Sequence, residues 1–445
     1  PQHNFEEMYY YRWWSLRKHI KETPVGYGMT EFLIQRSYSD KYNLIACAIG
    51  HHIYESRWLR DPKYLDQIIH TWYRGNDGGP MKKMDKFSSW NADAVLARYM
   101  VDGDKDYLLD MKKDLETEYQ RWERTNRLKN GLYWQGDVQD GMEESISGGR
   151  RKKYARPTIN SYMYGNAKAL SCIGILSGDE GMAMKYGMRA DTLKNLVENE
   201  LWNTRHQFFE TMRTDSSANV REAIGYIPWY FNLPDTTQKY EIAWKEIMDE
   251  KGFSAPYGLT TAERRHLEFR TRGVGKCEWD GAIWPFASAQ TLTAMANFMN
   301  NYPQTVLSDS VYFRQMELYV ESQYHRGRPY IGEYLDEMTG YWLKGDQERS
   351  RYYNHSTFND LIITGLIGLR PRLDNTIEVN PLIPADKWDW FCLDNVLYHG
   401  HNLTILWDKN GDRYHCGKGL RIFVDGKEVG QANTLTKIVC ENALK

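Results

Sequence analysis

The chain has 445 residues, a formal net charge of −2 and 14% aromatic residues, among them 16 Trp and 32 Tyr. The balanced charge argues against nucleic acid as a partner, and no window approaches the roughly 20 apolar residues of a membrane span. The six cysteines lie far apart without a C-x-x-C pair, which predicts neither a zinc site nor a dense disulfide framework. Trp and Tyr in loops are typical of surfaces that stack on sugar rings.

Helical periodicity alternates with loops marked by glycine and proline from residue 5 to about residue 370. The pattern predicts helices over 6–22, 41–59, 88–100, 105–123, 159–176, 180–202, 282–302, 310–324 and 356–369. Asp179 and Ser308 are candidate N-caps. Roughly eleven or twelve helices without βαβ alternation, and without a fixed repeat of 34 to 47 residues, favour a closed (α/α)6 toroid of six helical hairpins over an open solenoid.

Beyond residue 370 the apolar residues recur at every second position, which indicates strands. Asn410-Gly411 and Asp425-Gly426 lie between such runs and predict hairpin turns. The fold class is therefore mainly α with a small C-terminal antiparallel β domain. We expect a barrel domain over 1–371 and a β-sandwich-like domain over 372–445.

In a closed helical barrel the loops at one end line a central pit, so chemistry is expected on the longest connections, 126–157, 252–281 and 325–354. The first contains GDVQDGMEES, with Asp137, Asp140, Glu143 and Glu144 around a glycine. Neighbouring acids raise the pKa of at least one carboxyl, as a general acid requires. The alternative is a solvated acidic loop paired with the basic run 150–153.

The other two connections also place acids beside aromatic rings. In RPYIGEYLDEMTGYWLKGDQE, Glu333, Asp336 and Glu337 stand among Tyr330, Tyr334, Tyr341 and Trp342. In CEWDGAIWPF, Trp279 and Asp280 precede a predicted helix. Two carboxyl groups among rings that stack on sugars are what glycosidic cleavage uses.

Several other chemistries lack their sequence signals. The chain has no G-x-S-x-G, no H-E-x-x-H, no phosphate-binding P-loop and no cluster of His and Cys. The sequence therefore predicts no metal site and no cofactor. Carboxylates beside aromatics remain as the candidate catalytic groups.

Four motifs in order resemble the six-hairpin glycosidases of clan G, particularly the trehalase family and the family of processing α-glucosidase and mannosylglycerate hydrolase. The motifs are DGMEES (140–145), PTINSYMYGN (157–166), WDGAIWP (279–285) and EYLDEMTG (333–340). The resemblance implies an inverting glycoside hydrolase that cleaves an α-linked sugar of an oligo- or polysaccharide, with Glu143 as the proton donor and Glu333 as the base.

The sequence departs from the family pattern at two places, so other acids remain candidates for the catalytic roles. Met142 and Glu143 stand where the family has tryptophan and aspartate, so Asp140 or Glu144 could donate the proton instead. Glu337 replaces a proline of the family and adds a second acid near the base. The residues expected to bind substrate are Trp90, Asp93, Trp279, Asp280, Tyr334 and Trp342.

Three further functions compete with this prediction. An α-L-rhamnosidase-like glycosidase would share the barrel, the β tail and the inverting carboxylates. A polysaccharide lyase would need a Tyr/His/Arg set, for which His325, Tyr352, His355 and Arg151 are available. A catalytically inactive glycan-binding protein is the third. Because the first residue is Pro1, a removed signal peptide would not be visible; the compartment stays open, a periplasmic or secreted location is compatible, and the oligomeric state is not predicted.

Overall fold

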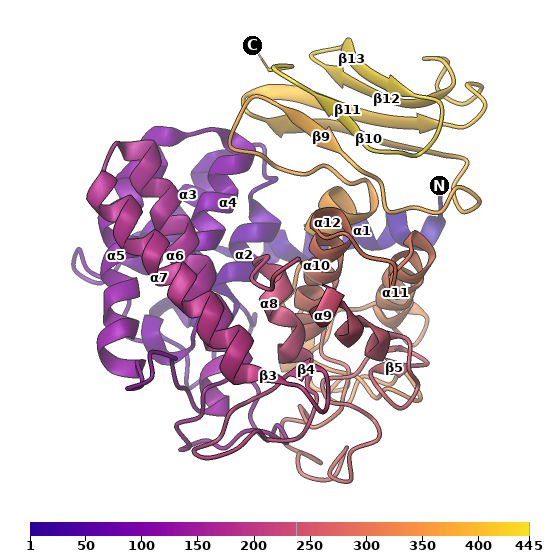
Figure 1. Ribbon diagram of the computed structural model, residues 1–445. Helices are drawn as coiled ribbons and strands as arrows, with labels where there is room; N and C mark the ends of the chain where they lie inside the picture. The colour runs from indigo at the N-terminus through magenta and orange to yellow at the C-terminus, as the bar shows by residue number, and fades with distance from the viewer. Residues whose placement is uncertain (237, 445) are drawn as a thin grey trace.

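The computed structural model describes residues 1–236 and 238–444 and consists of a ring of helices with a β-sheet over one end (Figure 1). Twelve α-helices lie in these described ranges. They are α1 (His3–His19), α2 (Ile49–Ser56), α3 (Pro62–Arg74), α4 (Asn91–Asp102), α5 (Lys105–Asn126), α6 (Pro157–Ser177), α7 (Glu180–Leu196), α8 (Ile227–Tyr230), α9 (Gln238–Glu241), α10 (Pro285–Asn301), α11 (Asp309–Ser322) and α12 (Asn359–Leu361).

The even-numbered helices form the inner wall of the barrel. Each contacts the next in the order α2, α4, α6, α8, α10 and α12, and α12 contacts α2, so the ring closes on itself. The odd-numbered helices α3, α5, α7 and α11 pack against inner helices from outside, and α1 packs against α11 and α12. The predicted (α/α)6 toroid is confirmed.

The extent of burial distinguishes the helices of the inner wall from those outside it. In α6 every residue from Pro157 to Ala167 is buried, as expected for a helix with neighbours on all sides. The outer helix α3 buries one face, with Leu65, Ile68, Ile69, Trp72 and Tyr73 at helical spacing. Glycines allow the inner helices to approach: a Cβ on Gly50 would lie 2.2 Å from the ring of Trp90.

Two predicted helices are shorter than their periodicity suggests. Helix α2 begins only at Ile49, because two 3-10 turns, Lys41–Asn43 and Ala46–Ala48, precede it, and Tyr42 and Asn43 in the first turn adopt positive φ angles of 60° and 62°. Helix α12 passes into a wider π turn, Ile362–Leu366. Asp179 caps α7 through the backbone N–H of Met182, as predicted, whereas the side chain of Ser308 makes no capping hydrogen bond to α11.

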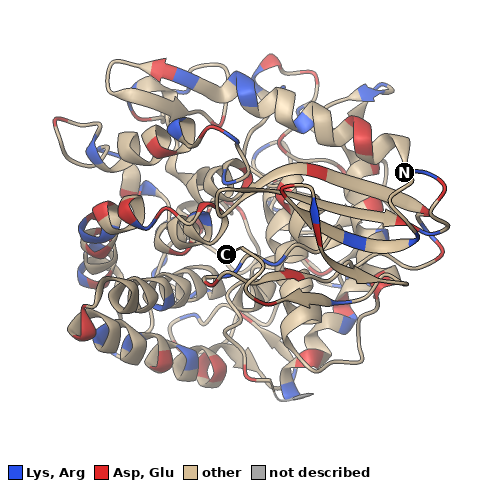
Figure 2. Ribbon diagram, turned by 90° about the horizontal axis from the view of Figure 1, so that it is seen from above, with Lys and Arg blue, Asp and Glu red and all other residues tan. Residues whose placement is uncertain are grey.

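Four strands form the sheet above the ring, in the order β10 (Trp390–Tyr398), β11 (His401–Asp408), β12 (Gly419–Val424) and β13 (Lys427–Ala432), all antiparallel. A second pair joins β9 (Ile377–Val379) to β14 (Ile438–Cys440). Figure 2 shows this sheet from above, with charges of both signs mixed over the molecule. The predicted division after residue 371 falls in the connection between the last inner helix and β9 and stays a prediction.

The two predicted hairpin turns differ in outcome. Asp425-Gly426 joins β12 to β13 directly, since Val424 pairs with Lys427. Asn410-Gly411 is not a two-residue turn, because β11 ends at Asp408 and β12 begins only at Gly419. The carboxylate of Asp408 accepts three backbone N–H groups of the intervening loop and holds it in place.

Short antiparallel hairpins lie in the connections of the barrel. They are β1 (Ile20–Thr23) with β2 (Gly26–Met29), β3 (Trp202–Asn203) with β4 (Phe208–Phe209), β5 (Ser254–Ala255) with β6 (Gly258–Leu259), and β7 (Tyr324–His325) with β8 (Arg328–Pro329). No helix in residues 1–236 and 238–444 is long and apolar enough to cross a membrane.

Candidate active site

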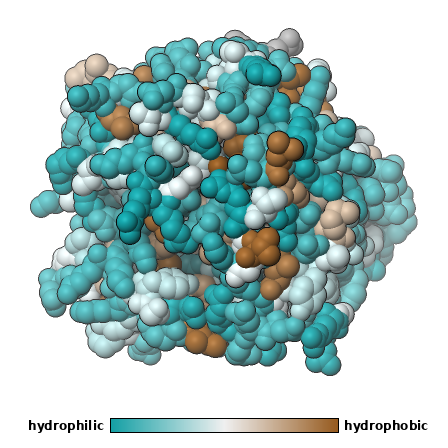
Figure 3. Space-filling view, turned by 90° about the horizontal axis from the view of Figure 1, so that it is seen from below, coloured by the Kyte–Doolittle hydropathy of each residue, from teal (hydrophilic) through white to brown (hydrophobic). Residues whose placement is uncertain are grey.

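A cavity of about 450 Å³ lies at the end of the ring where the inner helices begin. Its wall includes residues that precede these helices: Cys47 before α2, Phe87 before α4, Trp284 before α10 and Tyr353 before α12. The β-sheet covers the opposite end, where the N–H of His399 donates to the carbonyl of Val101 near the end of α4. Figure 3 shows the end away from the sheet, where hydrophilic residues dominate. Helix N-termini favour negative charge, so this end suits carboxylates.

The cavity is lined by both signs of charge and by aromatic rings. Its acids are Glu31, Glu143 and Glu333. Its basic residues are Arg36, Lys86, Arg150, Lys344 and Arg349, and its aromatic residues include Tyr38, Phe87, Trp279, Trp284 and Tyr353. Acids with flat rings around a cavity of this size suit a sugar ring, which has polar edges and apolar faces.

A buried arginine organises the loop that carries Glu143. Arg156, the residue before α6, has no exposed surface, and its Nε donates to Asp140 at 2.7 Å. Its other nitrogens donate to the hydroxyls of Ser147 at 2.9 Å and Ser145 at 3.3 Å. Asp140 also accepts hydrogen bonds from two further side chains, so its carboxylate is fully engaged in holding the loop. The alternative of a solvated acidic loop does not hold for Asp137 and Asp140, which are buried, although Glu144 lies near Arg150 of the basic run as that alternative expected.

The surroundings of Glu143 suit a proton donor. Burial raises the pKa of Glu143 to about 7, and the nearby carboxylates of Asp137 and Asp140 also raise it. Arg150 acts in the opposite direction. A carboxyl with this pKa carries its proton about half of the time at neutral pH, as a general acid must.

Glu333 has a different environment on the same cavity wall. Lys344 Nζ lies 3.9 Å and Arg349 Nη1 3.5 Å from its Oε2. Burial raises the pKa of Glu333, and these two cations counter that shift. Among the residues described here, Glu143 has no such ion pair within 4.0 Å. Burial thus raises the pKa of both carboxyls, but only Glu333 has two cations beside it that favour its charged form, and such unequal surroundings are the usual basis for dividing acid and base roles.

Backbone pairing holds the Glu333 segment beside the aromatic wall. Leu335 and Ile283 exchange two hydrogen bonds of 3.0 Å, which brings the loop 325–354 against the start of α10. Trp279 stacks on Trp284 with ring centroids 4.3 Å apart. The indole N–H of Trp284 donates to His355 at 2.9 Å. The ring surface that lines the cavity is therefore fixed by its own neighbours.

Three further predicted acids have partners inside the protein. Glu337 lies 3.4 Å from the Nε of Arg270. Glu144 adopts a positive φ of 70° and lies 3.7 Å from Arg150. Asp280 accepts the backbone N–H groups of Arg272 and Gly273, which orders the loop before Trp279. None of these three lines the cavity.

Three predicted aromatic residues are packing residues of the barrel. Trp90 is fully buried between inner helices, with its ring centroid 5.1 Å from that of His51 and 4.9 Å from that of Tyr162. The hydroxyl of Tyr334 donates to the carbonyl of Lys276 at 2.7 Å. The indole of Trp342 donates to the carbonyl of Tyr324 at 3.0 Å. Tyr334 supports Trp279 from behind, at a centroid distance of 5.0 Å.

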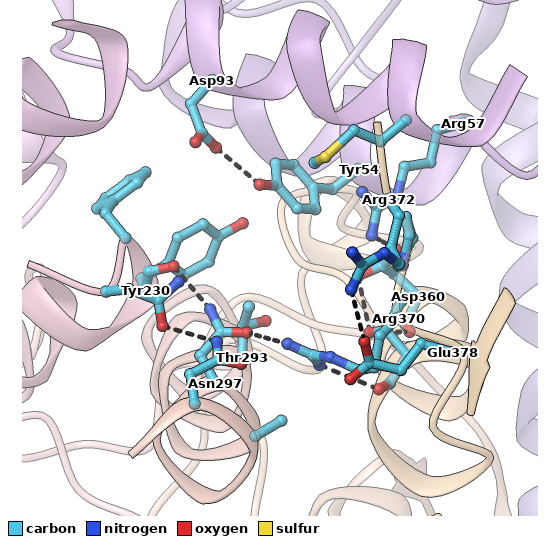
Figure 4. Close-up of a pocket in the computed structure, with 17 residues that line it drawn as sticks. Tyr54, Arg57, Asp93, Tyr230, Thr293, Asn297, Asp360, Arg370, Arg372 and Glu378 are labelled. Atoms are coloured by element: carbon cyan, nitrogen blue, oxygen red, sulfur yellow. Dashed lines mark hydrogen bonds and ion pairs between the residues drawn. The ribbon is translucent and has the colours of Figure 1, made fainter. Parts of the chain in front are cut away.

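Asp93 lines a second cavity, of about 310 Å³, at the opposite end of the ring. It accepts a hydrogen bond of 2.7 Å from the hydroxyl of Tyr54 (Figure 4). Burial raises the pKa of Asp93 to about 6. The structure thus brings Glu143, Glu333 and Trp279 to the wall of one cavity, whereas the other predicted residues do not line it.

The sequence analysis missed Glu31, a third acid on the wall of the first cavity. Burial raises the pKa of Glu31 to about 8, and the charges of Glu333 and Glu143 also raise it. A signal was present: Glu31 is a lone acid between apolar Met29 and Phe32, directly after the short strand β2. Lys344 and Arg349 were missed as well, because basic residues in a long loop read as solvated surface.

The comparisons with known proteins agree with this architecture. The family model described as mannosylglycerate hydrolase MGH1-like glycoside hydrolase domain matches residues 41–356, and the glycosyl hydrolase family 65 C-terminal domain matches residues 369–430. The crystal structure of a GH63 mannosylglycerate hydrolase from Thermus thermophilus in complex with glucose shares the fold, with a TM-score of 0.57 and 12% identity over 80% of this chain and 99% of that one.

Two other solved structures share the fold. A GH78 family rhamnosidase of Bacillus sp. GL1 has a TM-score of 0.62 and 10% identity over 95% of this chain and 41% of its own. A chain named "Sialidase" is 94% identical with a TM-score of 0.99 over all of this chain. This chain spans only 41% of that longer protein, whose name describes it as a whole.

Proposed function

The chain belongs to the mannosylglycerate hydrolase MGH1-like glycoside hydrolase family, and we propose that it hydrolyses an O-glycosidic bond with inversion of configuration, using Glu143 as acid and Glu333 as base. The observation that carries the proposal is that both glutamates line one cavity but differ in their ionic partners. Burial raises the pKa of both glutamates, and Lys344 and Arg349 counter this at Glu333. At Glu143, burial with the charges of Asp137 and Asp140 outweighs the opposing effect of Arg150 and raises the pKa to about 7.

In this mechanism Glu143 gives its proton to the glycosidic oxygen as the bond from that oxygen to the anomeric carbon breaks. Positive charge develops on the sugar ring, beside the carboxylates and the stacked rings. Glu333 removes a proton from a water molecule, whose oxygen attacks the anomeric carbon from the opposite face. The products are the freed alcohol and a sugar of inverted configuration, and proton exchange with solvent restores both glutamates.

We propose an α-linked sugar of an oligo- or polysaccharide as the substrate, in line with the motif resemblance described above. Trp279 and Trp284 supply the flat apolar surface on which a sugar face stacks. A neutral glycan matches the aromatic part of the wall.

An acidic sugar such as a sialoside is a second candidate substrate. The cavity wall carries five basic side chains and three acids, and only Lys344 and Arg349 among the five pair with a cavity acid in the described part of the chain. Arg36 and Lys86 therefore remain for an anionic group of a ligand, whereas Arg150 already pairs with Glu144 outside the cavity wall. The 94% identical chain named "Sialidase" adds to this candidate.

The test is sugar release by the purified protein from α-glucosides, α-mannosides, α-rhamnosides, α-sialosides and plant or host oligosaccharides. Glu143→Gln and Glu333→Gln are run beside Glu144→Gln, a control from the same loop. We expect release by the wild type and the control only, and proton NMR of the first product to show the inverted anomer. A retained anomer would contradict the mechanism, an unsaturated product would indicate a lyase, and tight binding without cleavage a glycan-binding protein.

A further inference from the structure

Glu31 lies on the cavity wall with Glu143 and Glu333, yet neither step of the mechanism uses it. Only 4% of its surface is exposed. Burying a carboxyl without full hydrogen bonding is unfavourable, so such a group in a cavity wall calls for a functional explanation.

The backbone around Glu31 is held firmly. Its carbonyl accepts the N–H of Asn354 at 2.9 Å, and the carbonyl of Thr30 accepts the side chain of Asn354 at 3.2 Å. The N–H of Thr30 donates to the carbonyl of His19 at 3.0 Å. The segment after β2 is therefore fixed against the segment 352–354, which carries another residue of the cavity wall.

One oxygen of the Glu31 carboxyl is engaged and the other is free. The hydroxyl of Tyr353 donates to Oε1 at 2.6 Å. The ring of Tyr353 is itself packed against Phe32, with centroids 4.3 Å apart. Oε2 has no hydrogen-bond partner among the residues that the structure describes. The carboxyl is thus oriented from one side, and its second oxygen is buried with its hydrogen-bonding capacity unfilled.

We propose that Glu31 is a substrate-binding residue whose free oxygen forms a hydrogen bond with a hydroxyl of the sugar held between Glu143 and Glu333. The proposal rests on the proposed function, since it assigns a role within the same site. A rigid acid beside both reacting glutamates can fix the sugar ring relative to them, which places the anomeric carbon between acid and base.

The protonation state suits this role. With its pKa raised by burial, Glu31 is largely protonated at neutral pH. A neutral carboxyl both donates and accepts, as a sugar hydroxyl does, so the pair can be fully satisfied. A neutral Glu31 also adds no charge beside the other two glutamates.

The experiment compares kcat and KM of the wild type, Glu31→Gln and Glu31→Ala on the substrate that the screen identifies. Glu31→Gln keeps a donor and an acceptor, so we expect a loss of less than about 10-fold in kcat/KM. Glu31→Ala leaves the hydroxyl unpaired and should lose about 100-fold. Glu118→Gln is the matched control, because Glu118 also accepts a tyrosine hydroxyl, that of Tyr73, but lies on the outer helix α5.

Monodeoxy analogues of the substrate distinguish binding from a merely structural role. For one analogue, the kcat/KM of the wild type should fall about as far as the substitution Glu31→Ala lowers it on the full substrate. The kcat/KM of Glu31→Ala should be nearly the same for this analogue and for the full substrate. If every analogue affects both proteins equally, Glu31 does not contact a sugar hydroxyl and the inference is overturned, while the hydrolase assignment stands. Wild-type activity of Glu31→Ala would overturn it equally.

A separate measurement covers the case of a wild type that cleaves nothing, which would refute the proposed function. Calorimetric titration with D-glucose, D-mannose, L-rhamnose and N-acetylneuraminic acid then replaces kinetics. Weaker binding by Glu31→Ala than by the wild type supports the inference. Equal binding of each sugar that binds overturns it, and a wild type that binds none of the four overturns both proposals.

Discussion

Both ends of the helical ring have a cavity lined by charged residues, but the two cavities differ in how completely those charges are paired. In the cavity below the β-sheet, Arg57 pairs with Asp360 at 2.8 Å and Arg372 with Glu378 at 2.9 Å (Figure 4). In the other cavity, Glu143 lacks an ion pair among the described residues, and an oxygen of Glu31 lacks a hydrogen-bond partner. A polar cavity alone therefore does not indicate a reactive site; what distinguishes this one is that incompletely paired carboxyls line it.

Helix direction explains part of this difference. The end below the sheet receives the C-termini of the inner helices, which carry partial negative charge. Arg57 directly follows α2, and Arg370 donates to the carbonyl of Thr364 at 3.2 Å. These arginines neutralise helix ends and join the ring to the segment that leads into β9. The opposite end has helix N-termini, which favour negative charge, and there Glu333 has Lys344 and Arg349 beside it while Glu143 has no ion pair among the described residues.

The largest expected effect separates the two ends by activity. Glu333→Gln should reduce kcat by about 10²- to 10⁴-fold, because the amide cannot accept a proton from water. Its fold should be unchanged, as judged by circular dichroism and the melting temperature. Glu337→Gln, four residues away and paired with Arg270 instead, serves as the control and should stay within a few-fold of the wild type. Full activity of Glu333→Gln would remove the basis for treating this end as the active one.

The next effect separates the ends by stability. Asp360→Asn leaves Arg57 buried without its charge partner, so we expect a loss of about 3 kcal/mol in the free energy of unfolding. The kcat of the folded fraction should not change. Urea denaturation of the variant beside the wild type measures the first quantity, and steady-state kinetics below the transition measures the second. A variant as stable as the wild type would show that this pairing is not structural.

The ring of helices was predicted from the sequence, as were two acids that the structure brings to one cavity, whereas most of the other residues on the cavity wall were not. Helical period and loop length carry information about which segments are long and irregular, and the acids Glu143 and Glu333 stood in such segments. Trp90 stood at a loop end too, yet it packs between inner helices, because periodicity does not distinguish a buried helix start from a cavity wall.

Glu31, in contrast, lines the cavity but was not predicted from the sequence. Its segment is short, with one acid and no second carboxylate nearby in sequence, so local composition gave it no weight. Its position on the cavity wall depends on residues more than 300 positions away in the sequence, because Tyr353 and Asn354 hold its side chain and backbone. Such contacts depend on closure of the ring, which brings the last inner helix beside the first.

A smaller effect concerns the pH dependence of the proposed reaction at the end that contains Glu143 and Glu333. We expect kcat/KM to fall above about pH 7, as Glu143 loses its proton, and to fall at low pH, as Glu333 gains one. Arg349→Ala removes a cation 3.5 Å from Glu333, which raises the pKa of Glu333 further. The acidic limb of the profile should therefore move to higher pH while the basic limb stays. Arg351→Ala, which lacks that contact, is the control, and movement of the basic limb alone would reverse the assignment.

The smallest effect concerns Asp93 in the cavity below the sheet. Its pKa is about 6 in the folded protein and about 3.9 in an unfolded chain, so the folded state binds the proton more tightly. The stability from this carboxyl is present below about pH 4 and is lost as the pH rises through 6. Asp93→Asn removes this titration. The free energy of unfolding of the variant should therefore rise relative to that of the wild type between pH 4 and pH 7, and the activity should not change. A difference that stays constant with pH would show that Asp93 titrates normally, and lost activity would mean that this cavity communicates with the catalytic one.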